Sequence, residues 1–180
     1  MSWVLALALL HQAAASSGSV CVDAPLNLLC LNWTTDSTNI TFSGFCSPPP
    51  GMTTITWCAF GLSTASVGDM FPSVVTAIQA GSASTWLEDR DSFIGYRSPP
   101  CFGTQVSTLL SSSKSGGNLT ATWTRPLNVS AALAAQHYQN LGGRMTLIAA
   151  SSSDTPAEAS VCEQEMQLHT YCVPGTPVVI

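Results

Sequence analysis

Short runs rich in Val, Ile, Thr, Trp and Phe recur along the chain, and clusters of Gly, Pro, Ser and Asp separate them. Runs of this length and spacing predict short β-strands in a sandwich or barrel. The clearest runs cover residues 28–33, 39–43, 53–62, 73–79, 84–87, 104–110, 118–124 and 144–150. In the run 118–124, threonine takes every second position, and Leu119, Ala121 and Trp123 lie between. This alternation predicts a strand with one solvated face and one buried face.

Little of the chain has helical periodicity. Only residues 130–139 suggest a helix, because Ser130 stands in the cap position before an alanine-rich stretch. The prolines at 48–50 and 99–100 argue against central strands there, because proline has no N–H for the sheet ladder. Residues 111–117 are expected to form a polar turn, and 151–159 a loop. The pattern predicts an all-β sandwich or barrel with one short helix.

The first residues predict an export signal. An apolar run ends at Leu10 and small residues follow to Ala15, which is the order of a secretory signal peptide. No Lys or Arg precedes the run, and a buried first strand or helix is the alternative. The run is too short to cross a bilayer, which takes about 20 apolar residues. We expect a signal peptide over 1–15, one domain over 16–173, and a tail or the start of a linker over 174–180.

Glycosylation motifs and cysteines also favour secretion. Four Asn-x-Ser/Thr motifs begin at Asn32, Asn39, Asn118 and Asn128. Seven cysteines stand at positions 21, 30, 46, 58, 101, 162 and 172. We expect disulfides in an oxidising compartment, with one cysteine free or paired with another chain. A bridge between Cys162 and Cys172 would close a short loop around His169. Zinc is the competing interpretation, but no Cys-x-x-Cys occurs.

The composition and the absence of certain motifs argue against several classes of function. Hydrophobic residues make up 46% of the 180 residues, which suffices for a core, and only 8% are charged. The net charge is −5, and the five basic residues do not cluster, which argues against binding to nucleic acid. A basic protein partner stays open. The chain has no Gly-x-Ser-x-Gly motif of a serine hydrolase. A copper monooxygenase needs an N-terminal histidine, which His11 supplies only if cleavage follows Leu10.

Met70 and His169 form a candidate pair of iron ligands. One thioether and one imidazole are the axial ligands of a six-coordinate, electron-carrying haem. Met70 lies at a turn-to-strand junction between Gly-Asp and Phe-Pro, and His169 has the apolar neighbours Leu168 and Tyr171. The alternatives are a core methionine and an exposed or hydrogen-bonded histidine. Other candidates are Met52, Met145 and Met166; we expect Met145 inside a strand and His137 facing solvent on the predicted helix.

Five segments carry a resemblance to a known family. They are Thr56–Ser63, Gly68–Ala77, Phe93–Pro100, Thr124–Leu127, and Leu147–Ala150 followed by Leu168-His169. In this order they are similar to an opening strand, a ligand methionine with its strand, a Gly-Tyr-x-x-Pro stretch, an Arg-Pro-Leu strand end and a ligand histidine. Together they resemble the DOMON family, and most of all the b-type cytochrome domain of cellobiose dehydrogenases. Cys58, Cys101 and Tyr171-Cys172 depart from the family pattern.

The resemblance implies an all-β, immunoglobulin-like sandwich of two antiparallel sheets with one short helix. It also implies a secreted domain that holds haem b between Met70 and His169, with Tyr96 and Arg97 at a haem propionate. The haem would be non-covalent, because no Cys-x-x-Cys-His occurs. With both axial positions filled, the domain would carry single electrons and would not be an enzyme. The implied donor is a flavin dehydrogenase or a membrane cytochrome, and the implied acceptor a copper oxygenase, a quinone or iron.

The alternative is a haem-free sandwich that binds carbohydrate or protein. Exposed tryptophans would favour this alternative, because they could serve as a ligand platform. The chain has four strand tryptophans, Trp33, Trp57, Trp86 and Trp123. We expect them in the core, since strand tryptophans are generally buried.

Overall fold

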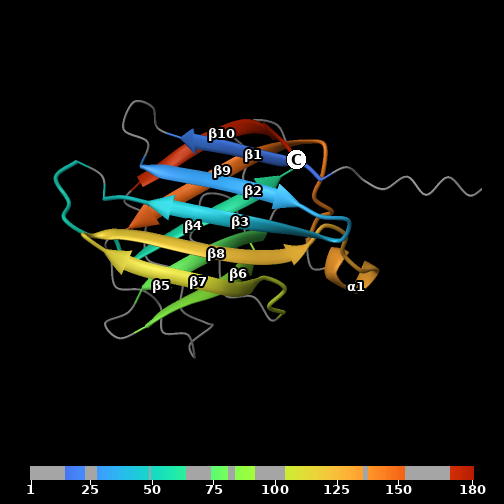
Figure 1. Ribbon diagram of the computed structural model, residues 1–180, viewed down its shortest axis with the longest axis horizontal. Coiled ribbons are helices and arrows are strands. Elements are labelled where there is room, and N and C mark those ends of the chain that lie inside the picture. Colours follow the sequence, from blue (N-terminus) through green and yellow to red (C-terminus); the bar gives the residue numbers. More distant parts are fainter. Residues whose placement is uncertain are drawn as a thin grey trace, which may run out of the picture.

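The chain folds as an antiparallel β-sandwich of two five-stranded sheets with one short helix (Figure 1), which confirms the predicted fold class. The computed structural model describes residues 15–22, 28–48, 50–63, 74–80, 84–91, 104–135, 138–152 and 171–180. Side chains are described in these ranges except at 74, 75, 90, 91, 152 and 171–177. The predicted signal peptide therefore lies almost wholly outside the described residues.

Each sheet is antiparallel throughout. Sheet A has the order β1 (Ser17–Val22), β2 (Leu29–Thr35), β3 (Asn39–Cys46), β8 (Asn118–Pro126) and β7 (Thr108–Ser115). Sheet B has the order β10 (Tyr171–Val179), β9 (Arg144–Ser152), β4 (Trp57–Ser63), β5 (Val74–Ala80) and β6 (Thr85–Asp91). The chain crosses between the sheets after β3, β6 and β8, so each sheet is built from distant parts of the sequence.

Three elements differ from those that the sequence pattern predicts. The edge strands β1 and β10 were not predicted. The stretch from Pro174 to Pro177, expected as a tail, lies within β10, where an edge position and a bulge after Val173 tolerate proline. Strand β7 extends to Ser115, so the turn predicted over 111–117 shrinks to Gly116 and Gly117. Both have a positive φ, +57° and +83°, as a tight two-residue hairpin requires.

The helix is shorter than predicted. Residues 130–139 were expected to be helical, but α1 covers only Ala131–Ala134. Ser130 caps it as predicted, because its side chain accepts a hydrogen bond from the Leu133 N–H. No residue of α1 is buried, so no packing supports a longer helix. Among the described residues, no helix is long and apolar enough to cross a membrane.

The core lies between the sheets and centres on aromatic rings. Trp123 of β8 lies 5.3 Å from Phe42 of β3 and 6.1 Å from Phe60 of β4, measured between ring centroids. Gly44 makes this contact possible, because a Cβ there would lie 2.8 Å from the Phe60 ring. The tryptophans were expected in the core, and Trp33, Trp57 and Trp123 are buried, while Trp86 is half-buried. Met145 is also buried, as predicted.

Two disulfides form among the described residues. Cys21–Cys30 joins β1 to β2 within sheet A, and Cys46–Cys58 joins β3 to β4 across the two sheets. Cys58, which departs from the family pattern, therefore serves as an inter-sheet link. Cys101 and Cys162 lie outside the described residues, and so does the side chain of Cys172. The predicted Cys162–Cys172 pairing stays a prediction.

Candidate functional site

The four residues predicted to hold a haem, Met70, His169, Tyr96 and Arg97, lie outside the described residues. The same is true of the alternatives Met166 and His137, while Met52 is described and half-buried. Within the described ranges, no group of three or more His, Cys, Asp or Glu side chains could hold a metal ion. The structure therefore bears on the candidate site through the described strands to which the segments with these residues are joined.

These segments are joined to opposite ends of sheet B. Residues 64–73, with Met70, connect β4 to β5, and residues 92–103, with Tyr96 and Arg97, follow β6. The register places Gly61 opposite Val75 and Val74 opposite Asp91, so both segments begin at one end, which we call the Ser63 end. Residues 153–170, with His169, connect β9 to β10. They begin at the other end, the Trp57 end, because Trp57 pairs with Ser152 and Tyr171 with Ser151.

The outer face of sheet B, which points away from sheet A, is buried. Ala59 of β4 is paired with Ala77 of β5 on one side and with Ala150 of β9 on the other. These three alanines, which we call the alanine floor, are 4%, 0% and 9% exposed, although sheet A lies on the opposite side. Trp57 and Ile148 complete this second apolar cluster. Small side chains on three adjacent strands therefore form one apolar surface.

Polar groups border the alanine floor at the Trp57 end. The Gln79 side chain is fully buried and donates from Nε2 to Glu88 Oε2 over 3.2 Å, and Trp86 Nε1 donates to Glu88 Oε1 over 3.0 Å. Two buried atoms have no hydrogen-bond partner, Trp57 Nε1 and Gln79 Oε1, on residues paired across β4 and β5. A buried donor or acceptor left unpaired costs about 1–3 kcal/mol, so a polar group or water at this edge would stabilise the pair, although Trp33 Nε1 and Trp123 Nε1 in the core are unpaired in the same way.

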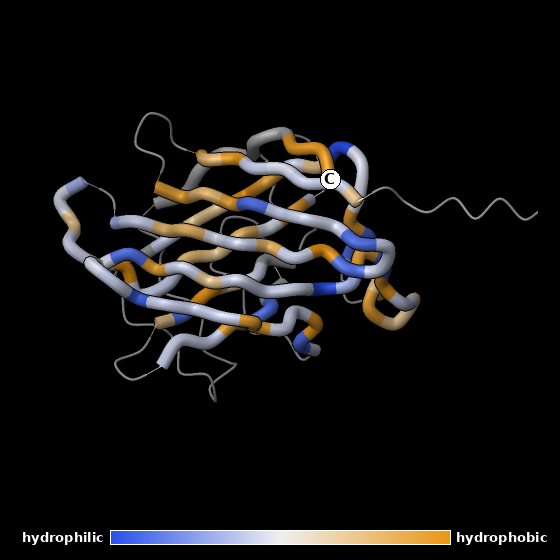
Figure 2. Tube along the Cα trace, in the orientation of Figure 1, coloured by the Kyte–Doolittle hydropathy of each residue, from blue (hydrophilic) through white to orange (hydrophobic). Residues whose placement is uncertain are grey.

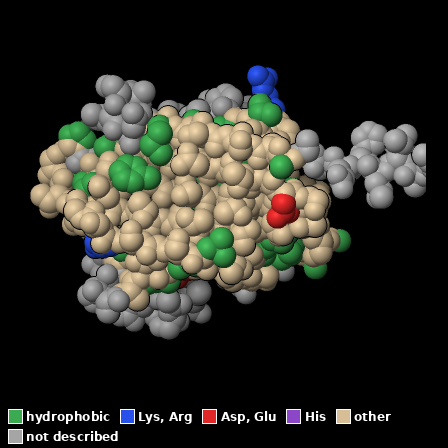
Figure 3. All heavy atoms as spheres, viewed as in Figure 1, with side chains coloured by type: hydrophobic (Ala, Val, Ile, Leu, Met, Phe, Trp, Pro, Cys, Tyr) green, Lys and Arg blue, Asp and Glu red, His purple; other side chains and the backbone are tan. Residues whose placement is uncertain are grey.

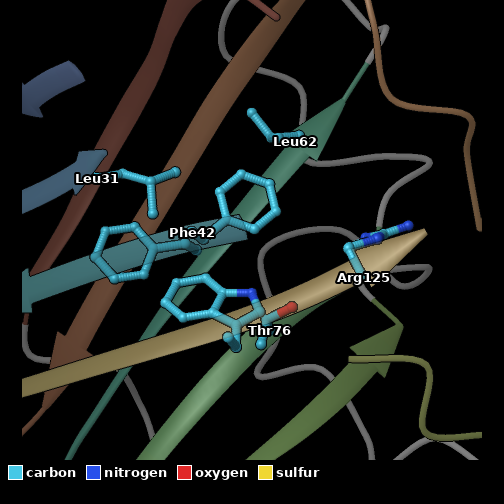
Figure 4. Close-up of a pocket in the computed structure, with 7 residues that line it drawn as sticks. Leu31, Phe42, Leu62, Thr76 and Arg125 are labelled. Carbon is cyan, nitrogen blue, oxygen red and sulfur yellow. The ribbon is translucent and has the colours of Figure 1, made fainter. Parts of the chain in front are cut away.

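The described part of the interior between the two sheets offers little space. A pocket there is lined by side chains from both sheets, among them Leu31, Phe42, Leu62, Thr76 and Arg125 (Figure 4). Its cavity volume is about 10 Å³, roughly the room of one water molecule. A porphyrin does not fit between the sheets. The candidate site is therefore the outer face of sheet B.

A buried polar network fixes the Ser63 end of the sandwich. One carboxylate oxygen of Asp89 accepts from Thr76 Oγ1 over 3.0 Å, and the other from the backbone N–H groups of Val106 and Ser107 over 2.8 and 2.6 Å. These bonds hold the chain that leads into β7 against β6.

Arg125 lies beside this network and is 5% exposed. Its guanidinium donates to the Gln139 carbonyl over 3.4 Å and lies 5.6 Å from the Tyr138 ring centroid. Burial lowers the pKa of Arg125, and the charges of Asp89 and Tyr138 partly offset this. Its Nε has no partner, so this cation is held mainly by a carbonyl and an aromatic face.

The fold has a counterpart among solved structures. The chain is similar to the cytochrome domain of Myriococcum thermophilum cellobiose dehydrogenase, with a TM-score of 0.58, 14% sequence identity, and coverage of 92% of this chain and 82% of that domain. No family model matches the sequence, and no curated protein does. The chain therefore has the sandwich fold of a cytochrome domain. At this identity the similarity shows the fold alone.

The alanine floor and the Asp89 network were not predicted from the sequence. A signal for the floor exists, because the continuous run from Trp57 to Leu62 has no polar residue at alternate positions. Such a run is typical of a strand that is buried on both faces. The Asp89 network gives no such signal, since its members come from three separate parts of the chain.

Proposed function

We propose that this chain is a b-type haem domain that carries single electrons, with Met70 and His169 as axial ligands. The observation that carries the proposal is the buried alanine floor on the outer face of a fold shared with a cytochrome domain. A haem is flat and largely apolar. It needs a surface of small apolar side chains that is shielded from water, and Ala59, Ala77 and Ala150 provide one.

The connections of the two ligand segments agree with this proposal. Ligands on opposite faces of one porphyrin have to approach from opposite sides. The segment with Met70 is joined to the Ser63 end of sheet B and the segment with His169 to the Trp57 end. Two segments from opposite ends can both reach the floor between them. Tyr96 and Arg97 belong to a segment from the Ser63 end, and we propose them as hydrogen-bond and ion-pair partners of a haem propionate.

The chemistry follows from the ligand set. A haem iron with both axial positions filled passes single electrons and has no open position for oxygen or substrate. The thioether of Met70 and the dry surroundings of the floor favour reduced iron and raise the reduction potential. The proposed partners are a flavin dehydrogenase or a membrane cytochrome as donor, and a copper oxygenase, a quinone or iron as acceptor. We also propose secretion, which the disulfides Cys21–Cys30 and Cys46–Cys58 support.

His169 is tested by substitution. The protein with His169→Ala should lose haem on purification or keep only five-coordinate iron, because one axial ligand is gone. Optical spectra of the oxidised and reduced protein measure this. The control is His137→Ala, which removes a histidine that the proposal does not use and should leave the spectrum unchanged. An unaltered six-coordinate, low-spin spectrum in the His169→Ala protein would remove His169 from the site.

Met70 is tested by its effect on the potential. Met70→His should keep the haem and lower the reduction potential, because a second imidazole favours oxidised iron more than a thioether does. A spectroelectrochemical titration measures the shift. Met52→His serves as the control, since Met52 is a half-buried methionine ahead of β4 that the proposal does not use. Equal potentials for the parent and Met70→His would contradict ligation by Met70.

A haem-free binding module is the second candidate, and one observation favours it. Trp57 Nε1 and Gln79 Oε1 are a buried donor and acceptor without partners, and the apolar part of a porphyrin would satisfy neither. A hydroxyl-rich ligand such as a carbohydrate would satisfy both. Glycan-array binding by the purified, colourless protein, lost on Gln79→Ala, would support this candidate over the first.

A further inference from the structure

Uncharged polar residues make up much of the outer face of sheet A. One row across the five strands runs through Ser17, Thr34, Thr41, Thr124 and Thr108, which the register places side by side. The next row runs through Ser19, Asn32, Ser43, Thr122 and Ser111. We call this surface the hydroxyl face. Figure 2 shows the pale, weakly polar stretches along these strands, and Figure 3 shows charged side chains only near the margins of the face.

Three glycosylation motifs lie in the strands of this face. In a strand, residues two apart point to the same side, so the Asn and the Thr of an Asn-x-Thr motif share a face. The middle residues of the three motifs are Trp33, Ile40 and Leu119, which are 6%, 0% and 0% exposed. Because the middle residues point into the core, the asparagines and threonines on either side of them point to solvent. The fold thus presents these motifs outward.

Asn32 and Asn118 differ from Asn39 in the surroundings of their side chains, and Asn128, although exposed, lies beyond β8 and outside this face. Asn32 is exposed in the middle of the face, and its neighbours across β1 and β3 are the small residues Ser19 and Ser43. Asn118 is half-buried at the hairpin between β7 and β8 and pairs with Ser115. Within the described residues, no hydrogen bond engages either side-chain amide. Asn39 differs, because its Nδ2 donates to Thr38 Oγ1 over 2.8 Å.

We propose that Asn32 and Asn118 carry N-linked glycans, which makes the hydroxyl face the sugar-bearing side of the molecule. The disulfides Cys21–Cys30 and Cys46–Cys58 belong to the oxidising compartment in which N-glycans are attached. The glycans would also supply polar surface that the few charged residues do not provide. Only 8% of the residues are charged, far below the roughly 25% that is typical of soluble domains. The glycans leave the outer face of sheet B, on the opposite side, free for function.

The test is secretion from a eukaryotic host followed by digestion with peptide N-glycosidase, which converts each formerly glycosylated asparagine to aspartate. Tandem mass spectrometry of the peptides should find aspartate at both positions 32 and 118 in most molecules. Asparagine at either position in most molecules overturns the proposal. This readout needs no haem, so its failure is distinct from failure of the proposed function.

Matched variants test whether each glycan depends on its Asn-x-Thr motif. Thr34→Ala and Thr120→Ala should each lose one glycan, seen as one step of faster migration in a denaturing gel. Thr34→Ser keeps the motif and should keep the glycan, and Thr122→Ala changes a hydroxyl of the same face outside any motif and should keep every glycan. Migration of Thr34→Ala or Thr120→Ala equal to that of the parent contradicts the proposal.

Discussion

The two sheets use their outer faces in opposite ways. Strand β8 of sheet A alternates residue by residue between half-buried and buried positions, whereas every residue of β4 in sheet B is buried. At β8, sheet A thus has one solvated face and one buried face. At β4, both faces of sheet B are buried. A sheet buried on both sides in a two-layer sandwich has something packed on its outside. The buried outer face therefore makes sheet B the candidate for a binding surface.

The two outer faces also differ in how their polar groups are satisfied. Sheet A exposes hydroxyl and amide groups that water satisfies, so the face needs no partner. Sheet B buries Gln79, Glu88 and Trp57 beside the alanine floor, and two of their polar atoms, Trp57 Nε1 and Gln79 Oε1, are unpaired. Unpaired buried atoms also occur on strands of sheet A, at Trp33 Nε1 and Trp123 Nε1, so the burial of its outer face is what distinguishes sheet B.

The largest expected effect contrasts two neighbours on β8. Trp123→Ala should lower the free energy of unfolding by about 3–5 kcal/mol, because a fully buried ring is removed from between Phe42 and Phe60. Thr122→Ala on the hydroxyl face should change it by less than about 0.5 kcal/mol. Urea unfolding followed by fluorescence measures both. Similar losses for the two variants would show that sheet A has no dry face.

The inter-sheet disulfide should contribute nearly as much. Replacing Cys46 and Cys58 together by alanine should lower the free energy of unfolding by about 3 kcal/mol, because the bridge closes a loop with a sequence separation of 12. Thermal unfolding without reductant measures this loss. A double variant as stable as the parent would mean that the two sheets hold together without the covalent link.

A change on the alanine floor sharpens the contrast between the outer faces. Ala77→Leu should cost about 1–3 kcal/mol, because Ala77 is fully buried and a larger side chain overpacks the site. Under the proposed function it should also weaken haem retention. Thr122→Leu makes a comparable enlargement on the hydroxyl face and should cost less than about 0.5 kcal/mol. Equal tolerance of the two changes would refute a packed outer face on sheet B.

The smallest effect belongs to the exposed turn between β2 and β3. Backbone hydrogen bonds from Thr38 and Asn39 lower the pKa of Asp36 below its ordinary value of 3.8. A lowered folded-state pKa adds stability above the unfolded-state pKa, and this is lost as the pH falls through the folded-state value. Asp36→Asn should therefore be slightly less stable than the parent near neutral pH and equally stable in strong acid. A gap independent of pH would contradict this origin.

Much of the fold could be predicted from the sequence, because local patterns determine it. The alternation of Thr120, Thr122 and Thr124 with apolar residues predicted β8, and each of the eight predicted runs overlaps a strand, although the run 104–110 shares only residues 108–110 with β7. The edge strands β1 and β10 escaped prediction, since serine, glycine and proline carry little strand preference, and it is pairing with β2 and β9 that makes them strands.

The site could be predicted less completely. Met70 and His169 were proposed from ligand chemistry and resemblance, and no described residue tests them. The alanine floor depends on Ala59, Ala77 and Ala150 meeting across three strands, which only the register reveals. Single alanines in separate runs give no sign of this. Contacts between distant segments are therefore what the sequence pattern leaves out.

The central claim is that the outer face of sheet B holds a haem with two axial protein ligands. The most direct measurement is the visible absorption spectrum of the secreted protein, supplied with haem and recorded oxidised and reduced. The account predicts a low-spin, six-coordinate b-type spectrum that switches reversibly between the two states. A colourless protein, or a bound haem with five-coordinate iron, would contradict it.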